Sequence, residues 1–437
     1  INKADCIFLV GLGDGDPAIG DMENLLVRMK VTARKELVLL HPERYVRPGS
    51  TIEWLKRRRF VSSHYHVQMP LDTSQIIMKT TEKSKFNIVK YLQKYTKVYL
   101  QKYTKESLNS SNTSFTGNRS DFARLGRRIL SKSIGLVLGG GGARGLAQAG
   151  MIKVMEDTGI PIDMVGGVSI GSFIGGLYSQ HGNLIPILGK LKQFSERMSS
   201  YLYFIMDVTY PITAPLSGRQ FNRNIMSAFK NANIEDTWIP FFCITTNITW
   251  SRGETHLSGS MWKYIRASMS LSGFLPPICS EKGHLLMDGG YVNNLPADIM
   301  RNLGAKTVIA IDVASEDDTT PIYYGDSLSG WNVLFSRMNP FGKKVGKLPT
   351  LTDIQSRLAY VSCVKSLEEV KVLEGCYYLR PPVTSYGTLE FGKMKEISSR
   401  GIEYMEEVLK DWKKRNILEK EFGMYKEKQR HGRRFSI

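Results

Sequence analysis

One serine of the sequence stands in a pattern typical of a catalytic nucleophile. Ser169 is the centre of Gly167-Val168-Ser169-Ile170-Gly171, which follows the apolar run Met164–Val165 and precedes a helix-compatible segment. Such a strand-to-helix turn is so tight that small residues must stand two positions before and after the serine, and the following helix N-terminus stabilises developing negative charge. We therefore predict a nucleophile elbow formed by Gly167, Ser169 and Gly171. A glycine-rich turn with a chance serine is the alternative.

A run of glycines is the second candidate element. Gly139–Gly145 directly follows the apolar run Ile134–Leu138 and precedes another helix-compatible segment. Consecutive glycines let several backbone N–H groups point into one concavity, which holds a phosphate or a tetrahedral oxyanion. No Gly-Lys-Ser/Thr follows, so this is not a Walker A loop, and the next strand ends at Ser169 instead of the acid of a dinucleotide site. An oxyanion hole beside the serine explains both glycine motifs together.

The general base has candidates of two kinds. Three of the seven histidines follow Ser169 at moderate distance, but none stands in a loop suited to meet it. They are His181, His256 and His284. Asp288 ends an apolar run and is followed by Gly289 and Gly290, so its carboxylate can be approached closely. Because partial desolvation raises the basicity of a carboxylate, we predict Asp288 as the base; a plain Asp-Gly turn is the alternative.

These candidates need an α/β domain to bring them together. From residue 133 onward, apolar runs alternate with glycine-rich turns and helix-compatible segments, which predicts a mostly parallel sheet covered on both faces. The predicted strands are Ile134–Leu138, Met164–Val168, Phe241–Asn247, Leu285–Met287 and Thr307–Val313. The predicted helices are Leu146–Thr158, Ile170–Ser179, Lys263–Ser270, 350–372 and 393–422.

The first 130 residues have a different character. Apolar runs at Cys6–Val10 and Glu36–Leu40, with a helix-compatible stretch at Met22–Lys35 between them, predict a small α/β unit. Lys and Tyr repeat with a period of eight residues within 84–106, which predicts a basic helix, and 107–120 is typical of a flexible linker. We expect four segments: a small α/β segment at 1–83, a basic helix and linker at 84–130, a catalytic domain at 131–315, and a mainly helical extension at 316–437 that packs on the catalytic domain or a membrane.

The composition excludes several classes of protein. The 437 residues are 42% hydrophobic and 23% charged, which excludes disordered, collagenous and coiled-coil chains. The five scattered cysteines form no Cys-x-x-Cys pair, so we expect no disulfide framework or cysteine zinc site, and a reducing compartment. No apolar run reaches the ~18 residues of a membrane span. The chain begins at Ile1 without a signal-like segment, so we expect it to be a piece of a longer protein.

The net charge of +18 favours an anionic partner. Residues 1–130 carry 23 Lys and Arg against 12 Asp and Glu, whereas the middle of the chain, with the candidate chemistry, is nearly neutral. Basic segments that flank a neutral domain fit an anionic membrane surface better than nucleic acid. A basic nucleic-acid module on residues 52–106 is the alternative, although no recognition motif is present there.

The three motifs in order, Gly140–Gly145, Gly167–Gly171 and Asp288–Gly290, resemble those of the patatin-like phospholipase family. Longer stretches resemble its vertebrate neuropathy target esterase subgroup, whose members act as lysophospholipases. These stretches are Arg266–Gly273, Gly289–Pro296, Tyr324–Trp331 and Gln355–Val361. The resemblance covers roughly residues 130–400, and 1–70 is similar to the region that precedes the catalytic domain in that subgroup.

The resemblance implies a three-layer α/β/α sandwich and a Ser–Asp dyad without a third member. Ser169 would be the nucleophile and Asp288 the proton acceptor, in a mechanism with an acyl-enzyme intermediate. The oxyanion hole would come from Gly140, Gly141 and Gly142. Arg144, with Gly145, would hold that loop or the lipid headgroup.

The function implied is hydrolysis of lysophospholipids, such as lysophosphatidylcholine, to a fatty acid and a glycerophospho-headgroup. No cofactor, metal or nucleic acid is expected. The location that the resemblance implies is a membrane or lipid-droplet surface, on the cytosolic face of the endoplasmic reticulum. A phosphate- or dinucleotide-binding protein that uses Gly139–Gly145 is the alternative.

Two apolar stretches bear on substrate access. We expect part of 184–206 to line or cover the site, and the helix Ile402–Phe422 to pack on the domain or lie on a membrane.

Overall fold

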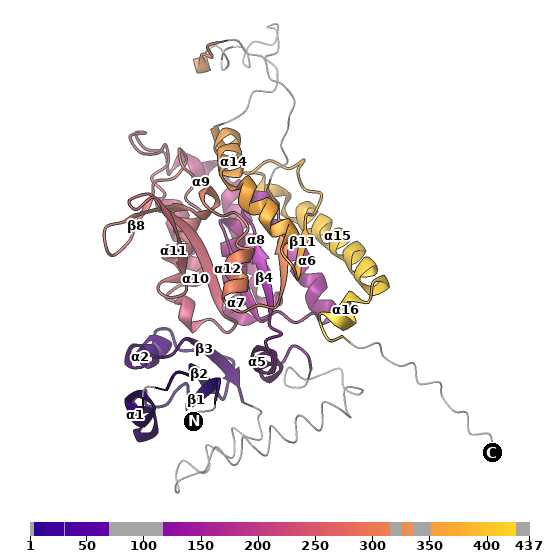
Figure 1. Ribbon diagram of the computed structural model, residues 1–437. Helices are drawn as coiled ribbons and strands as arrows, with labels where there is room; N and C mark the ends of the chain where they lie inside the picture. Colours follow the sequence, from indigo (N-terminus) through magenta and orange to yellow (C-terminus); the bar gives the residue numbers. More distant parts are fainter. Residues whose placement is uncertain are drawn as a thin grey trace, which may run out of the picture.

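Two sheets organise the chain (Figure 1). The computed structural model describes residues 4–29, 31–69, 117–314, 326–331, 333, 335 and 351–424. The basic helix expected at 84–106 and most of the linker expected at 107–120 lie outside the described residues.

The larger sheet has the strand order β11-β10-β4-β5-β6-β9-β8, and β7 pairs with β6. Its strands are β4 (Ile134–Leu138), β5 (Met164–Gly167), β6 (Phe241–Asn247), β7 (Arg252–His256), β8 (Ile278–Cys279), β9 (Leu285–Asp288), β10 (Thr307–Ile311) and β11 (Cys376–Leu379). The pairs from β11 to β6 are parallel, whereas β7, β8 and β9 add antiparallel pairs. The predicted mostly parallel sheet is therefore confirmed, and it extends to β11, in the C-terminal part of the chain.

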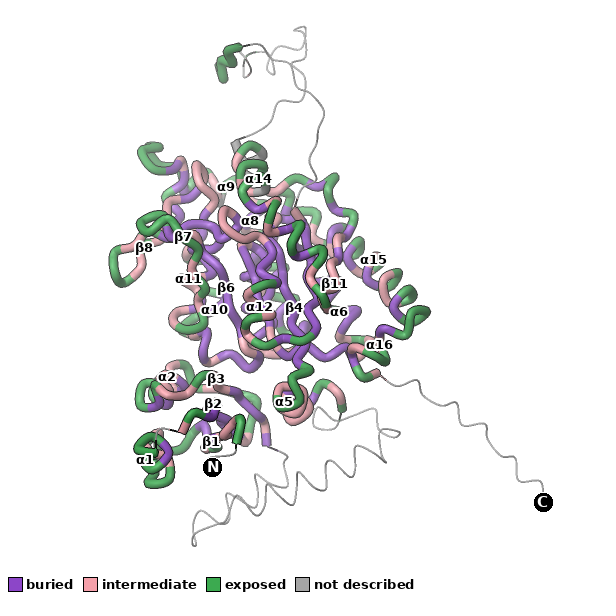
Figure 2. The backbone as a smooth tube through the Cα atoms, viewed as in Figure 1, coloured by how far each residue is buried: buried purple, intermediate pink, exposed green. Residues whose placement is uncertain are grey.

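Helices cover both faces of this sheet. Because successive side chains of a strand point to opposite faces, Leu136 and Leu138 of β4 pack on one side and Val137 on the other. The first face is covered by α6 (Leu146–Thr158), α7 (Ile170–His181), α8 (Ile185–Ser199), α10 (Arg219–Phe229), α11 (Met261–Ser268) and α15 (Met394–Lys414). The second is covered by α12 (Ala297–Asn302) and α14 (Leu351–Val372). Figure 2 shows β4 buried between these layers, and the three-layer α/β/α fold is confirmed.

The C-terminal helix α15 packs on the domain. Gly150 of α6 and Gly401 of α15 let the two backbones approach so closely that a Cβ atom at either position would collide with the other helix. Met405 and Trp412 of α15 are buried in the same core as α6. The helix ends at Lys414 because Asn416 takes a left-handed conformation, and the short α16 (Ile417–Lys420) follows. Among the described residues no helix is both long enough and apolar enough to cross a membrane.

The smaller sheet is parallel, in the order β1 (Cys6–Leu12), β2 (Arg34–His41) and β3 (Ser63–Gln68). The predicted helix Met22–Lys35 is wrong in its second half: α1 spans Asp21–Arg28. Arg34 and Lys35 instead belong to β2, where they pair with Cys6 and Ile7 of β1. Trp54 of α2 (Ser50–Arg57) packs into the core on one face of this sheet.

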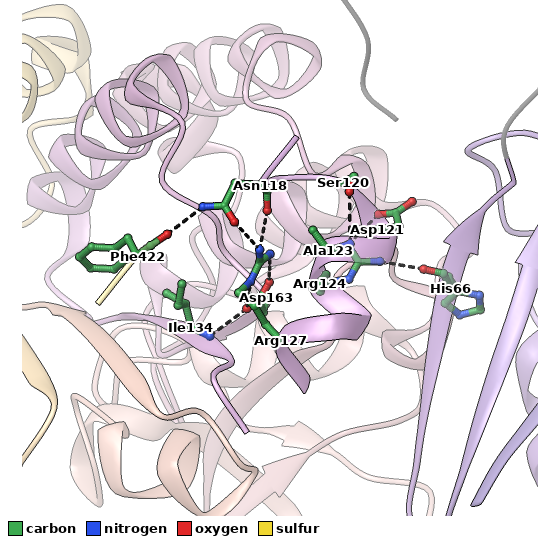
Figure 3. Close-up of polar contacts among 10 residues, drawn as sticks. All are labelled: His66, Asn118, Ser120, Asp121, Ala123, Arg124, Arg127, Ile134, Asp163 and Phe422. Atoms are coloured by element: carbon green, nitrogen blue, oxygen red, sulfur yellow. Dashed lines mark hydrogen bonds and ion pairs between the residues drawn. The ribbon is translucent and has the colours of Figure 1, made fainter. Parts of the chain in front are cut away.

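An unpredicted helix, α5 (Asp121–Ile129), joins the two sheets (Figure 3). Its Phe122 and Leu125 pack against the smaller sheet, and Arg124 donates to the carbonyl of His66 in β3 at 2.7 Å. Arg127 makes two bonds to Asp163, of 2.9 and 2.6 Å, and Asp163 also accepts the backbone N–H of Ile134, where β4 begins. The start of the larger sheet is therefore fixed to the helix that covers the smaller one.

Candidate active site

Ser169 lies in a sharp turn between β5 and α7. Its φ of 53° is rare for a residue with a side chain, and such strain persists only where the surroundings enforce it. A Cβ atom at Gly167 would collide with the backbone of Gly171, and one at Gly171 would collide with the carbonyl of Leu138. Both predicted glycines thus have a steric reason to be there, and the turn holds Ser169 at the N-terminus of α7.

The sheet register brings Asp288 to the level of Ser169. Gly167 of β5 is level with Cys243 of β6, and Thr245, two residues further along β6, is level with Asp288 at the end of β9. Ser169, two residues beyond Gly167, therefore faces Asp288 across the end of one intervening strand. The antiparallel insertion of β9 next to β6 is what permits this meeting.

The two side chains form one hydrogen bond: Ser169 Oγ donates to Asp288 Oδ2 at 2.7 Å. The other carboxylate oxygen, Oδ1, accepts the backbone N–H of Gly290 at 2.8 Å. Burial raises the pKa of Asp288 to about 6, and the two hydrogen bonds only partly oppose that rise. A carboxylate of this basicity is ionised at neutral pH and is suited to accept the serine proton.

The glycine loop follows β4 and lies against Ser169. A Cβ atom at Gly140 would be 3.0 Å from the Cβ of Ser169. The Gly140 N–H is already bonded, at 3.2 Å, to Oδ1 of Asn294. Among the described residues, no protein acceptor is bonded to the backbone N–H of Gly141 or Gly142. Of the three predicted oxyanion donors, this arrangement leaves the second and third available.

Arg144 lies within the loop. Its side chain is buried, with Nε donating to the carbonyl of Gly141 at 3.2 Å and Nη2 to the hydroxyl of Thr388 at 3.0 Å. Of the two roles considered for Arg144, these bonds favour holding the loop. Gly145 lies so close to Ile170 that any side chain there would collide with it, which fixes the loop against the start of α7.

A cavity opens at Ser169 and Asp288, and much of its lining is apolar. Six of the apolar lining residues are Ile170, Met198, Phe221, Phe274, Leu275 and Phe391. Of the stretch 184–206, Met198 lines the cavity, whereas Ile187, Leu191 and Phe194 pack in the core. A hydrocarbon chain that enters this cavity would extend away from a polar end formed by Ser169, Asp288 and the glycine loop.

The three histidines are used elsewhere. The ring of His256 stacks on Tyr264 and bonds to Thr245 Oγ1 at 2.7 Å, and burial lowers its pKa to about 4. His284 lies against Trp250, and His181 ends α7. None of the three histidines lines the cavity. Of the candidate bases, the structure therefore places only Asp288 beside Ser169.

Two polar side chains at the site were not predicted. Ser268, at the end of α11, accepts the backbone N–H of Ser169 at 2.9 Å. Asn294 pairs with both backbone groups of Gly140, since its Nδ2 also donates to the Gly140 carbonyl at 3.3 Å. Both stand in stretches quoted for the family resemblance, but nothing in their spacing showed a role.

Comparison with known proteins divides the chain near residue 133. Residues 1–131 match the family described as "Neuropathy Target Esterase family P-loop like domain", and residues 136–301 match "Patatin-like phospholipase". The second match contains the glycine loop, the elbow and the Asp-Gly-Gly turn.

Among curated proteins the chain is similar to fungal ones. It is 50% identical over 424 residues to "Lysophospholipase NTE1" of Mycosarcoma maydis, covering 94% of this chain and 22% of that protein. It is 48% identical over 427 residues to "Lysophospholipase nte1" of Aspergillus niger, covering 96% of this chain and 27% of that protein. The chain thus spans about a quarter of the length of these relatives. They are fungal, so the expected vertebrate affiliation stays a prediction.

A solved structure, "Crystal structure of VipD from Legionella pneumophila", aligns with a TM-score of 0.34 and 13% identity over 64% of this chain and 67% of that one.

The raised pKa of Asp288 predicts how the reactivity of Ser169 depends on pH. The carboxylate must be ionised to take the serine proton, and its ionised fraction falls as the pH falls through about 6. The rate at which an organophosphonate labels Ser169 should therefore be about tenfold lower at pH 5 than at pH 7. Mass spectrometry measures the labelled fraction, and circular dichroism at both pH values checks that the fold is unchanged. A constant rate down to pH 4 would mean that Asp288 has an ordinary carboxyl pKa or is not the base.

The pairing of Asn294 with Gly140 predicts a role in positioning the loop. Asn294→Ala removes both bonds to Gly140, so the loop is no longer fixed where an oxyanion would form. Organophosphonate labelling of Ser169 should slow roughly tenfold or more. Asn293→Ala is the matched control, because the neighbouring asparagine bonds to Asp298 and Leu295 instead of to the loop. Equal rates in the two variants would refute the role of Asn294.

Proposed function

Since the chain belongs to the patatin-like phospholipase family, in its neuropathy target esterase branch, we propose that it is a serine lipid hydrolase that cleaves the acyl ester of lysophospholipids with Ser169 and Asp288. The observation that carries the proposal is the 2.7 Å hydrogen bond from Ser169 Oγ to Asp288 Oδ2 at the polar end of an apolar cavity.

The first half of the reaction acylates the serine. Asp288 takes the proton of Ser169 Oγ as this oxygen attacks the carbonyl carbon of the ester. The carbonyl oxygen becomes an oxyanion, which the backbone N–H groups of Gly141 and Gly142 stabilise together with the N-terminus of α7. When the tetrahedral intermediate collapses, the bond to the glycerol oxygen breaks, and this oxygen leaves with the proton from Asp288.

The second half of the reaction releases the fatty acid. Asp288, ionised again, takes a proton from a water molecule, and the resulting hydroxide attacks the acyl carbonyl. The same N–H groups stabilise the second oxyanion. The Ser169 oxygen then leaves and recovers its proton from Asp288, so one carboxylate serves as base and acid in both halves.

The substrate class follows from the cavity and from the relatives. Apolar side chains such as Phe221, Phe274 and Phe391 line one continuous space beside the dyad, which suits an acyl chain. The relatives at 48–50% identity bear the name lysophospholipase. Lysophosphatidylcholine is the substrate proposed, with glycerophosphocholine and a fatty acid as products and no cofactor.

The proposed location of the protein is a membrane or lipid-droplet surface, on the cytosolic face of the endoplasmic reticulum. Its support is chemical: a lysophospholipid is an amphiphile that partitions into such surfaces, and the chain carries a net charge of +18, which anionic lipids attract.

The alternative of a phosphate- or dinucleotide-binding loop has less support. Two of the N–H groups that would cradle a phosphate are occupied, since Gly140 donates to Asn294 and Ala143 donates to the carbonyl of Thr388 at 2.8 Å. The loop also lies so close to Ser169 that a Cβ atom at Gly140 would be only 3.0 Å from the Cβ of that serine, which suits the stabilisation of an oxyanion formed there.

A serine-to-alanine pair tests the proposed nucleophile. Ser169→Ala should reduce release of fatty acid from lysophosphatidylcholine by at least about a thousandfold, because no attacking oxygen remains. The matched control is Ser179→Ala, a buried serine of the same helix region that bonds to the carbonyl of Gly175 and is not part of the cavity lining. The measurement is fatty acid release by mass spectrometry. Wild-type activity in Ser169→Ala would refute the proposal.

A further inference from the structure

A segment beside the cavity presents apolar side chains to solvent. It comprises α9 (Tyr201–Ile205) and the loop that follows to residue 218, and we refer to residues 201–218 as the α9 segment. Six of its large side chains are between 65% and 86% exposed. They are Tyr201, Leu202, Met206, Val208, Tyr210 and Ile212. Soluble proteins rarely expose so many large apolar side chains together unless the surface binds something.

The fold holds this segment in place. Asp207 is buried, and its carboxylate accepts bonds from Ser217 Oγ at 2.5 Å and from the backbone N–H groups of Gly218 and Arg219 at 3.0 and 3.1 Å. The backbone also closes on itself, with Thr209 N–H donating to the carbonyl of Pro215 at 2.9 Å. The exposed apolar side chains therefore belong to an ordered loop that its own hydrogen bonds hold in place.

The α9 segment adjoins the cavity. Met198, just before it in α8, lines the cavity, and the ring of Phe204 lies 6.1 Å from the ring of Phe274, another lining residue. Figure 1 shows α9 in the upper part of the molecule, away from β1, β2 and β3. An acyl chain that left a lipid surface in contact with the α9 segment would therefore have a short path to Ser169 and Asp288.

The charges around the segment are mainly positive. Asp207 is the single charged residue within 201–218, and it is buried. Residues 185–230 carry six Lys and Arg against two acidic residues, and Arg219 and Arg223 are exposed directly after the segment. We refer to the exposed residues 208–212 as the tip of the segment. An apolar tip with flanking cations and interfacial tyrosines is the combination that binds anionic lipid.

We propose that the α9 segment is the lipid-docking surface of this protein, which inserts its apolar side chains into an anionic lipid surface while Arg219 and Arg223 contact lipid headgroups. The proposal rests on the proposed function, because lipid docking explains how an amphiphilic substrate reaches the cavity. It moves the lipid contact away from α15, whose apolar side is buried against α6. A second copy of the chain would not need the flanking positive charge, since like charges would then meet.

Vesicle binding of the whole 437-residue chain tests the proposal. The double variant Tyr210→Ser, Ile212→Ser removes two side chains from the exposed tip. The matched control is Leu130→Ser, Val372→Ser. It removes two apolar side chains of 67% and 84% exposure, one just after α5 and one at the end of α14, outside the α9 segment. The probes are vesicles of phosphatidylcholine with and without phosphatidylserine, and bound protein is measured by co-sedimentation. Hydrolysis of a short-chain ester in free solution is measured in parallel.

The tip variant should bind phosphatidylserine vesicles roughly tenfold more weakly than wild type, and the control variant should bind as wild type does. Hydrolysis of the soluble ester should be equal in all three proteins, which shows that the tip variant is folded. Equal vesicle binding by tip and control variants would overturn the proposal, as would a tip variant that changes only the oligomeric state. If vesicle binding behaves as expected but no protein hydrolyses any ester, the docking surface stands and the proposed function fails.

Discussion

The site depends on one hydrogen bond, from Ser169 Oγ to Asp288 Oδ2, and on keeping its carboxylate out of water. Burial alone makes Asp288 a stronger base than an ordinary carboxylate, because the charged form loses solvation. The cost of an ionised buried carboxylate is offset by two donors, the Gly290 N–H and the serine hydroxyl. The proposed reaction uses no histidine, but it needs exact placement of Ser169 and Asp288, and the rest of the architecture supplies that placement.

Placement comes from three elements that converge at the end of the sheet. The turn after β5 fixes the serine, the antiparallel strand β9 places the carboxylate one strand away, and the loop after β4 lies against the serine. Asn294 connects the second and third of these, since it follows the Asp-Gly-Gly turn in the chain and pairs with Gly140 in the loop. A shift of β9 by one residue would turn Asp288 to the opposite face of the sheet and abolish the site.

Features that depend on adjacent residues could be predicted from the sequence, whereas features that depend on tertiary contacts could not. The turns that hold Gly167, Ser169 and Asp288 could be predicted because adjacent small residues mark each of them. The catalytic roles of Ser169 and Asp288 stay predictions. Asn294 was missed because its partner Gly140 is 154 positions away, and nothing local to an Asn-Asn pair distinguishes one residue from the other. The helix predicted to Lys35 was too long because pairing with β1 decides where β2 begins, and α5 was missed because it is stabilised by contacts with both sheets.

The claim that Ser169 forms an acyl-enzyme is tested most directly by trapping that species. The chain is mixed with lysophosphatidylcholine, quenched with acid within one turnover and digested, and the peptides are examined by mass spectrometry for a fatty acyl ester. Acyl groups are expected on the peptide that contains Ser169 in wild type, and none in Asp288→Asn, which retains the shape of the site without the base. Release of fatty acid with no acylated serine, or an acyl group on a different residue, would contradict it.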